Sequence, residues 1–563
     1  MAEEFDFAIV GGGASGIYSA WRLANASNAD LKKIRDKIGG EGPLKVAVFE
    51  QSGRIGGRLL SASPPSMKEM PLELGGMRYL NTQTLVKGLV ENKLKIKRHK
   101  QDVDVADNIA YLRRRMFRQS ELHVPGVDLP YVLPEREKWI LRDQSTSTPA
   151  ELIFWAVFQE FPEIKGMAPA DLPNFLQSAK VDGKPLYQVG FWNLLSRHLS
   201  HEGRQLAITA IGYDVLGANA NAVDIIAENF DFTPGTEYFL FDEGFESVIW
   251  RLQSEFEACG GTVKLNASLA SFDEAVPGDP KGGFELTFET GDPANARAIV
   301  LAMPPAAIKR LLRRGPLLDP KIKHAGRVRR LMNSVEGIPL YKLFVIYDRP
   351  WWKEQLGLEK GRSLTDMPVR QCYYWSTNDE KPSAIMAYND QASTSFWGGY
   401  QTGPLGARDT GLSDINDPVE GALAFQGSGG GAVQPTDDVQ KRRVSNWKDH
   451  EAPHEMVVEM HRQLMEMHCV TNAPMPIDAA FMDWMNEPYG GAVHFWNPGH
   501  KSWEVRDDMT QPISGLNAFV VGEAFSTAQT WVEGALQTSE IFLQDRLNMA
   551  KPDWIDDDGD GSE

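Results

Sequence analysis

The clearest chemical signal lies at the start of the chain, where glycines follow an apolar run. Phe5 to Val10 is almost continuously apolar, Gly11-Gly-Gly-Ala-Ser-Gly16 comes next, and helical spacing then continues to Leu23. This order predicts a strand, a tight turn and a helix, the context in which G-x-G-x-x-G binds a dinucleotide pyrophosphate. Gly11 would permit the turn, Gly13 would let the backbone approach the phosphates, and Gly16 would let helix and strand pack. Ala14 and Ser15 would present N–H groups at the helix N-terminus.

A second strand is predicted at Val46–Glu50, and it ends in a carboxylate. There Glu50 could accept hydrogen bonds from both hydroxyls of a ribose, with Gln51 beside it. Glu50 lies 34 positions after Gly16, farther than the usual spacing, and we assign the excess to a polar connection over residues 25–45. The alternative is a solvated charge at the end of a strand.

The next segment, Ser52-Gly-Arg-Ile-Gly-Gly-Arg58, makes the pattern specific. It resembles the flavin amine oxidase family, in which a dinucleotide fold is followed by G-R-x-G-G-R. Gly57 would let the chain pass close to the cofactor, and Arg54 and Arg58 could neutralise phosphate charge.

Later segments extend the resemblance along nearly the whole chain. Gly260–Leu265 resembles a strand whose backbone, at Val263, would contact the adenine side, and Val520–Ala524 resembles the turn that holds the ribityl chain, with Gly522 and Glu523. The resemblance implies FAD as the cofactor. Nothing in residues 486–492 supplies the cysteine that monoamine oxidases use to tether flavin, so we expect non-covalent FAD.

Two further positions concern electron transfer. Thr530–Ser539 resembles the helix that begins beneath the flavin pyrimidine ring, with Trp531 as a wall of the substrate site and Val532 and Ala535 against the cofactor. A helix N-terminus there stabilises negative charge. The resemblance also implies that Lys342, before an apolar strand, is linked through a water to flavin N5 and assists the reaction with oxygen; a surface lysine is the alternative.

The substrate end is predicted at Leu72–Tyr79, which contains Gly75, Gly76, Met77 and Arg78. Amine oxidases resemble this segment up to the glycines but lack the arginine, whereas L-amino acid oxidases and amino acid monooxygenases carry G-x-M-R. We therefore expect Arg78 to bind the substrate carboxylate through its guanidinium fork. One residue of the Tyr373–Tyr374 pair should also reach the carboxylate, with Tyr374 slightly favoured, and Trp496 lies in a less informative matching stretch.

Together with the resemblance, these residues predict an FAD-dependent L-amino acid oxidase, and the resemblance implies a broad range of hydrophobic and aromatic amino acids as substrates. Hydride would pass from Cα to flavin N5, and the products would be a 2-oxo acid, ammonia and hydrogen peroxide. Three alternatives stay open: an L-amino acid 2-monooxygenase giving amide and carbon dioxide, an amine or polyamine oxidase, and a flavin-binding scaffold without turnover.

Composition excludes several other classes. The chain has 563 residues, a formal net charge of −18 and three cysteines. An acidic surface disfavours nucleic acid and anionic lipid, and three cysteines without a C-x-x-C pair disfavour a structural zinc site, so no metal is expected. No signal peptide or membrane-spanning run is seen, which favours the cytoplasm without excluding secretion. The expected partners are an L-amino acid and O2, and the family often forms dimers or larger homo-oligomers.

The helices and strands expected to position these residues indicate that the chain has three structural parts. The fold class is mixed α/β, with a Rossmann-like FAD-binding domain from residues 1–70, 233–330 and 505–550. A mixed-sheet substrate domain would comprise 71–110 and 331–504, with a flexible insertion at about 393–450 that is either functional or passive. A helical domain would cover 111–232, and an acidic tail 551–563.

Overall fold

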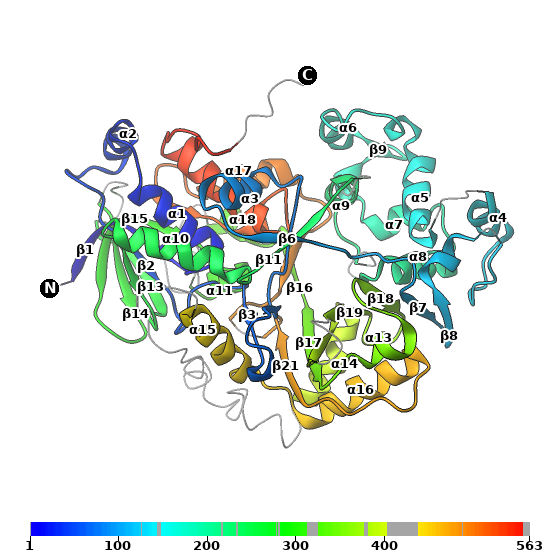
Figure 1. Cartoon of the computed structure of the whole chain (residues 1–563). Coiled ribbons are helices and arrows are strands. Elements are labelled where there is room, and N and C mark those ends of the chain that lie inside the picture. Colours follow the sequence, from blue (N-terminus) through cyan, green and yellow to red (C-terminus); the bar gives the residue numbers. More distant parts are fainter. Residues whose placement is uncertain are drawn as a thin grey trace.

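The computed structural model describes residues 2–124, 126–143, 148–214, 218–231, 235–276, 279, 282–311, 325–375, 381–401, 437–486 and 488–555. The molecule contains two large sheets, smaller sheets, and a group of helices at one end (Figure 1). The predicted mixed α/β class is confirmed.

The first large sheet is assembled from strands that are far apart in the sequence. Its central strand β1 (Glu3–Val10) pairs in parallel with β2 (Val46–Phe49) on one side and with β15 (Ala294–Leu301) on the other. The remaining strands of this sheet are β12 (Thr262–Lys264), β13 (Leu269–Glu274), β14 (Phe284–Phe288) and β23 (Ala518–Val520). Since β12, β2, β1, β15 and β23 are parallel, their carboxyl ends meet at one edge.

Helices and a second core cover the two faces of this sheet. Phe7 and Ile9 of β1 pack with α1 (Ala14–Ala24) and α10 (Glu246–Ala258), whereas Ala8 and Val10 face the core on the other side. Burial on both faces explains why the second half of β1, from Phe7 to Val10, is continuously apolar instead of alternating. The C-terminal helix α18 (Val532–Glu540) packs against α1, although the two lie at opposite ends of the sequence.

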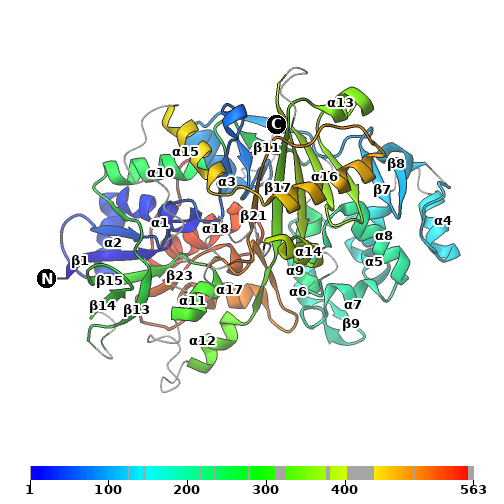
Figure 2. The same cartoon turned by 90° about the horizontal axis from the view of Figure 1, so that it is seen from below.

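The second large sheet is mixed. Its strands follow the order β21 (Asp478–Asp483), β17 (Leu340–Tyr347), β20 (Ser383–Asp390), β19 (Gln371–Trp375), β18 (Arg362–Thr365), β7 (Ile109–Leu112) and β8 (Arg115–Arg118). All pairs are antiparallel except β18 with β7. One face packs against α13 (Trp351–Leu356), α14 (Ala392–Gln401) and α16 (His454–His468), and Figure 2 shows α16 lying across this sheet.

The helical part lies at the right of Figure 1 and has its own apolar core. Its helices are α4 (Glu135–Asp143), α5 (Leu152–Glu160), α6 (Leu172–Ser178), α7 (Phe191–Leu195), α8 (His201–Ile211) and α9 (Ala222–Asp231). The boundary expected at residue 111 is wrong, because it cuts through β7, whose hydrogen-bond partners are β8 and β18. A strand cannot leave its sheet without losing these bonds, so we move the boundary to about residue 119.

A small three-stranded sheet contains β5 (Tyr79–Leu80), β11 (Tyr238–Phe241) and β6 (Arg98–Gln101), with β11 in the middle. Residues 81–110 thus supply β6 to this small sheet and part of β7 to the second large sheet. The polar connection 25–45 contains α2 (Asn28–Ile38), whose N-terminus is capped by the Ser27 hydroxyl.

The segment expected to be a flexible insertion begins and ends in helices. Residues 392–401 form α14 and residues 437–448 form α15 (Asp437–Lys448), while 402–436 lie outside the described residues, as does most of the acidic tail. Among the helices that the structure describes, none is both long and apolar enough to cross a bilayer.

Candidate flavin and substrate site

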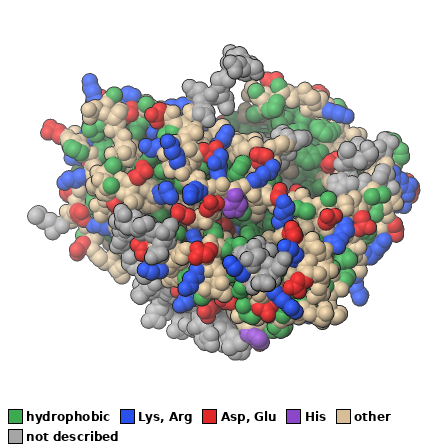
Figure 3. All heavy atoms as spheres, in the orientation of Figure 1, with side chains coloured by type: hydrophobic (Ala, Val, Ile, Leu, Met, Phe, Trp, Pro, Cys, Tyr) green, Lys and Arg blue, Asp and Glu red, His purple; other side chains and the backbone are tan. Residues whose placement is uncertain are grey.

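A cavity of about 1490 Å³ extends from the carboxyl edge of the first sheet to the inner face of the second. Val10, Phe49 and Ala302 line it at or just beyond the ends of β1, β2 and β15. At the other end it is lined by apolar residues of the helical part, including Phe154 and Ile211. Figure 3 shows that this face of the molecule is hollowed beside the helical part and that hydrophobic side chains form much of the wall.

The glycine-rich turn has the features predicted for phosphate binding. Gly11, Gly13, Ala14 and Ser15 line the cavity, and α1 begins there without a side-chain cap, so its first N–H groups face the cavity. Gly11 has φ +112°, and a Cβ there would lie 2.4 Å from the Ala302 carbonyl oxygen. Gly16 does not line the cavity.

Glu50 ends β2 at the cavity and is held firmly, with Gln51 lining the wall beside it. Its Oε2 accepts the Gly12 N–H at 2.7 Å, and its Oε1 accepts the N–H and hydroxyl of Ser52 at 2.9 and 2.8 Å. Val263 is not among the residues that line the cavity; it pairs with Val48 and packs against the core beneath the sheet.

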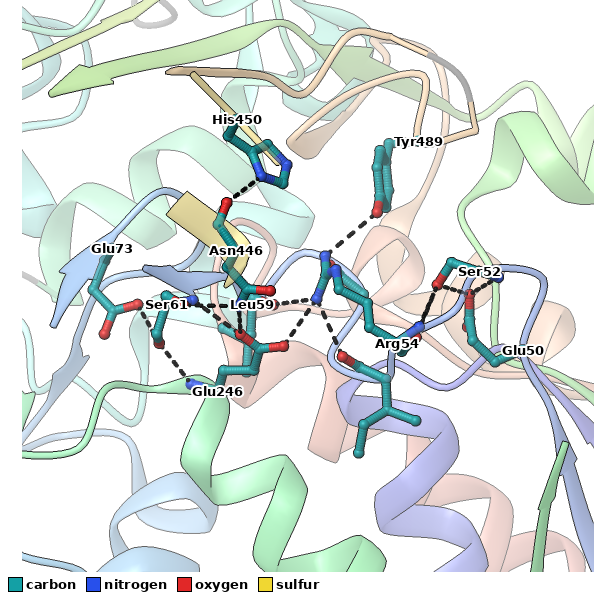
Figure 4. Close-up of polar contacts among 12 residues, drawn as sticks. Glu50, Ser52, Arg54, Leu59, Ser61, Glu73, Glu246, Asn446, His450 and Tyr489 are labelled. Carbon is teal, nitrogen blue, oxygen red and sulfur yellow. Dashed lines mark hydrogen bonds and ion pairs between the residues drawn. The ribbon is translucent and has the colours of Figure 1, made fainter. Parts of the chain in front are cut away.

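The two arginines of the G-R-x-G-G-R segment behave differently. Gly57 and Arg58 line the cavity, and Arg58 Nη1 donates to Glu523 Oε1 at 2.6 Å. Arg54, expected to neutralise phosphate, instead turns into the protein, where it pairs with Glu246 at 3.1 Å and donates to backbone carbonyls (Figure 4). The expectation for Arg54 is therefore wrong, because Arg54 is not among the residues that line the cavity, whereas Arg58 is.

Glu523 is a buried carboxylate between two donors. It accepts from Arg58, and the same Oε1 lies 2.6 Å from Nδ1 of His494. Burial opposes ionisation, but the charges of Arg58 and His494 outweigh it and lower the pKa of Glu523 to about 2. Gly522 and Glu523 line the cavity.

This pKa shift predicts how acid destabilises the protein. The pKa of Glu523 in the folded state lies below the usual 4.5, so the ionised carboxylate stabilises the folded protein. This stabilisation is complete above pH 4.5 and is lost as pH falls toward 2. The loss is on the order of 3 kcal/mol. Glu523→Gln should therefore flatten the fall of Tm between pH 5 and 3, measured by circular dichroism against the wild type. A parallel fall in both proteins would contradict the assignment.

The N-terminus of α18 forms another wall. Trp531 is the N-cap residue, and Trp531, Val532 and Ala535 all line the cavity. Glu533 faces the other way and accepts the N–H groups of Leu85 and Val86 at 2.9 and 2.8 Å, which fixes the start of the helix.

Lys342 is buried in β17 and only 2% exposed, which argues against a surface lysine. Its Nζ donates to the carbonyl oxygens of Glu73, at 3.0 Å, and Gly75, and it lies 5.3 Å from the centre of the Tyr388 ring. Burial lowers the pKa of Lys342 well below the usual 10.5; Arg78 lowers it further and Glu73 opposes the shift.

Arg78 lies in the cavity wall next to Gly75, Gly76 and Met77, which also line it. Its Nη1 donates to Gln101 Oε1 at 3.0 Å, its Nη2 to the Tyr213 hydroxyl at 3.5 Å, and its guanidinium stacks on Tyr238 with the ring centre at 4.2 Å. Of the described residues, none forms an ion pair with Arg78 within 4.0 Å. Three other guanidiniums in or near the cavity wall form ion pairs: Arg54 with Glu246, Arg58 with Glu523 and Arg362 with Asp104.

The tyrosine pair does not lie as expected. Tyr373 lies near Arg78, with its ring centre 5.9 Å from the guanidinium carbon. Tyr374 points to the other face of β19, into a different apolar core. There the Tyr374 hydroxyl contacts Ser363 at 2.6 Å and His468 at 2.7 Å. The preference for Tyr374 is therefore wrong, because neighbours in a strand point to opposite faces. Neither tyrosine is among the residues that line the cavity.

Trp496 is also a core residue. It is 1% exposed, and its indole N–H donates to the Ser526 carbonyl at 3.0 Å. The aromatic residues that line the cavity near Arg78 are instead Tyr213, Tyr238 and Tyr388. Sequence reasoning missed these three tyrosines and also Arg362 and Asp104, because no local motif connects them. Tyr213 follows α8, Tyr238 begins β11 and Tyr388 lies in β20, whereas Arg362 begins β18 and Asp104 lies in a loop.

Comparison with known proteins identifies the class. Residues 14–397 match the flavin-containing amine oxidoreductase family, so the chain belongs to this family. It is similar to aplysianin-A of Aplysia kurodai, with 25% identity over 98% of this chain and 92% of that protein. It is also similar to achacin of Lissachatina fulica, with 22% identity over 95% of this chain and 92% of that protein.

Solved structures show the same fold. A putrescine oxidase with bound putrescine superposes with a TM-score of 0.60 at 16% identity, covering 97% of this chain and 99% of that one. The predicted family and the FAD cofactor are thus confirmed.

The residues present fit FAD. The backbone at Gly13 and Gly57 leaves the cavity open, since a Cβ at either position would project toward the other glycine. Residues at the N-termini of α1 and α18 line this space, where their N–H groups would suit the phosphates and the ring system of FAD. No cysteine lines the cavity in the described part of the chain, which supports non-covalent binding. We propose that the first sheet with its helices is the FAD-binding domain and the second sheet the substrate domain.

Proposed function

We propose that this protein is an FAD-dependent L-amino acid oxidase. The observation that carries the proposal is Arg78, a buried cation in the cavity wall that has no ion-pair partner among the described residues. A buried charge without a counter-charge is costly. The α-carboxylate of an amino acid supplies that counter-charge, whereas an amine substrate does not.

The surroundings of Arg78 fit this role. Gln101 accepts a hydrogen bond from the guanidinium at 3.0 Å, and the Tyr238 ring stacks on it at 4.2 Å. The Tyr213 hydroxyl, which lies 3.5 Å from Nη2, can add a hydrogen bond to the same carboxylate. A carboxylate bound bidentately fixes which face of Cα points toward the cofactor.

When bound, FAD supplies the two-electron acceptor for the Cα–H and amine of the substrate. The chain's own contribution is to position and to stabilise charge. Arg78 orients the carboxylate, the N-terminus of α18 stabilises negative charge on the ring system, and the Lys342 ammonium holds a proton at Nζ close to the Glu73 and Gly75 carbonyls. The imino acid product is hydrolysed by water to a 2-oxo acid and ammonia, and oxygen is converted to hydrogen peroxide.

The rest of the cavity favours apolar side chains. Among its lining residues are Leu122, Phe154, Ile211 and Leu364, and two charged residues near Arg78, Arg362 and Asp104, form an ion pair at 2.9 Å. We therefore propose a broad preference for hydrophobic and aromatic amino acids. A monooxygenase would share all these contacts, so the structure does not favour it over an oxidase.

The test compares substrates and products. With L-phenylalanine we expect one hydrogen peroxide and one ammonia per amino acid consumed, and much lower activity on phenethylamine. Phenylacetamide with carbon dioxide would instead indicate a monooxygenase, and higher activity on phenethylamine would indicate an amine oxidase. Failure of L-phenylalanine and other L-amino acids to bleach the flavin anaerobically would indicate a scaffold without turnover.

We also propose a homo-oligomer, a dimer or larger, and a cytoplasmic location, with secretion as the alternative. Sedimentation velocity of the purified holoprotein tests the first, and cell fractionation tests the second. The formal net charge of −18 supports the absence of nucleic-acid and anionic-membrane partners. Binding of the protein to duplex DNA at physiological salt would contradict that part of the proposal.

A further inference from the structure

Helix α15 lies within the predicted insertion at about residues 393–450. It packs on the part of the chain that forms the proposed flavin site. It contacts β3 (Ser61–Ala62), which lies between Arg58 and Arg78 in sequence. In Figure 1, α15 and β3 are neighbours although some 380 residues separate them in the chain, as in the pair Arg443 and Ser63.

Arg443 of α15 is 2% exposed and uses its whole guanidinium to hold this region. Nε donates to the Ser63 hydroxyl at 3.0 Å, Nη2 to the Lys68 carbonyl at 2.9 Å, and Nη1 to the Glu243 carbonyl at 3.0 Å. The Ser63 N–H returns a bond to the Arg443 carbonyl at 3.0 Å. A buried arginine with three carbonyl or hydroxyl acceptors is a rigid connection.

Asn446, on the next turn of α15, reaches the network drawn in Figure 4. Its amide N–H₂ donates to the Ser61 carbonyl at 2.9 Å and to Glu246 Oε2 at 3.1 Å. The other Glu246 oxygen pairs with Arg54, and Ser61 also bonds to the Glu73 carboxylate at 2.8 Å. Burial raises the pKa of Glu246, and Arg54 and the hydrogen bond from the Ser61 N–H oppose the rise.

Both ends of the held segment line the flavin site. At its start are Gly57 and Arg58, and at its end Gly75 and Gly76. The carbonyls of Glu73 and Gly75 are also the acceptors for Lys342. Displacement of Ser61 or Ser63 would therefore move groups at two edges of the cavity together.

We propose that α15 is a strut for the flavin site, and that Arg443 and Asn446 are positioning residues that set FAD affinity through segment 57–76. Neither side chain is among the residues that line the cavity, so both act through Ser61, Ser63 and Glu246. The proposal depends on FAD binding and not on the identity of the substrate.

The test measures FAD binding directly. Apoprotein variants are titrated with FAD, and the dissociation constant is followed by quenching of flavin fluorescence, while the Tm of the apoprotein is measured separately. We expect Arg443→Met and Asn446→Leu each to raise the Kd for FAD at least tenfold. Lys441→Met is the matched control, because Lys441 is on the same helix but its side chain is 78% exposed; its Kd should stay within twofold of wild type.

Two outcomes would overturn the proposal. One is a lower apoprotein Tm with an unchanged Kd, which would make α15 a stabilising element only. The other outcome concerns Arg443→Lys, a variant to be used in case Arg443→Met does not fold. This variant keeps the positive charge but can form fewer hydrogen bonds. Its Kd for FAD should lie between those of the wild type and Asn446→Leu. A wild-type Kd in Arg443→Lys, together with equal rates of proteolytic cleavage of α15 in the wild type with and without FAD, would contradict a strut.

Discussion

Arg78→Ala should raise the KM for L-phenylalanine about 100- to 1000-fold while FAD stays bound. The variant loses a bidentate, charge-assisted interaction with the carboxylate, and each such hydrogen bond contributes about 1.5–3 kcal/mol. In the wild type, the contacts of Arg78 with Gln101 and Tyr238 orient the guanidinium before substrate binds. Steady-state kinetics by peroxide release, with the visible flavin spectrum as a check on FAD content, measures the effect.

Phenethylamine provides the control for this prediction, because it lacks the carboxylate but keeps the ring and the amine. Its already low rate should change by less than about threefold in Arg78→Ala, since neutral contacts are retained. Arg78→Lys should recover only part of the lost affinity, because an ammonium cannot bind a carboxylate bidentately. An unchanged KM for phenylalanine would reassign Arg78 and remove the basis for choosing an amino acid over an amine.

Lys342→Met should slow the reaction of the reduced enzyme with oxygen about 100-fold and slow anaerobic reduction by substrate much less. The Nζ–H groups of Lys342 lie at the cavity wall, held by the carbonyls of Glu73 and Gly75, where they can supply charge and a proton. Stopped-flow absorbance separates the two half-reactions. Equal slowing of both would show that Lys342 only supports the structure.

The pH dependence gives a second readout for Lys342. Burial lowers its pKa below the usual 10.5, so the ammonium is lost as pH rises through that lowered value. If the charged form assists oxygen, the wild-type oxygen rate should fall with rising pH at a midpoint below 10.5, and Lys342→Met should show no such fall. Loss of activity in the variant with an unaltered pH profile would oppose the assignment.

The sequence by itself was sufficient for the parts of the site that are local in the chain. Gly11 to Gly16, Glu50, Arg58 and the segment Gly75–Arg78 each belong to a short motif in which neighbouring residues share one turn or strand end. Such motifs specify backbone geometry over a few residues, and the structure places these segments along one cavity. The same reasoning failed for Tyr374, because a one-residue difference within a strand reverses the direction of the side chain.

Other features depended on contacts between distant segments. Tyr213, Tyr238 and Tyr388 meet around Arg78 only because the helical part, the small sheet and the second large sheet converge there. Arg54 and Arg58 are four residues apart and chemically alike, yet Glu246 captures one and Glu523 the other at the cavity. Sequence thus determined which backbone turns and charged groups are available. Tertiary structure decided which charges are neutralised inside the protein and which remain for a ligand. The reason is that electrostatic pairing depends on distance in space and not on separation along the chain.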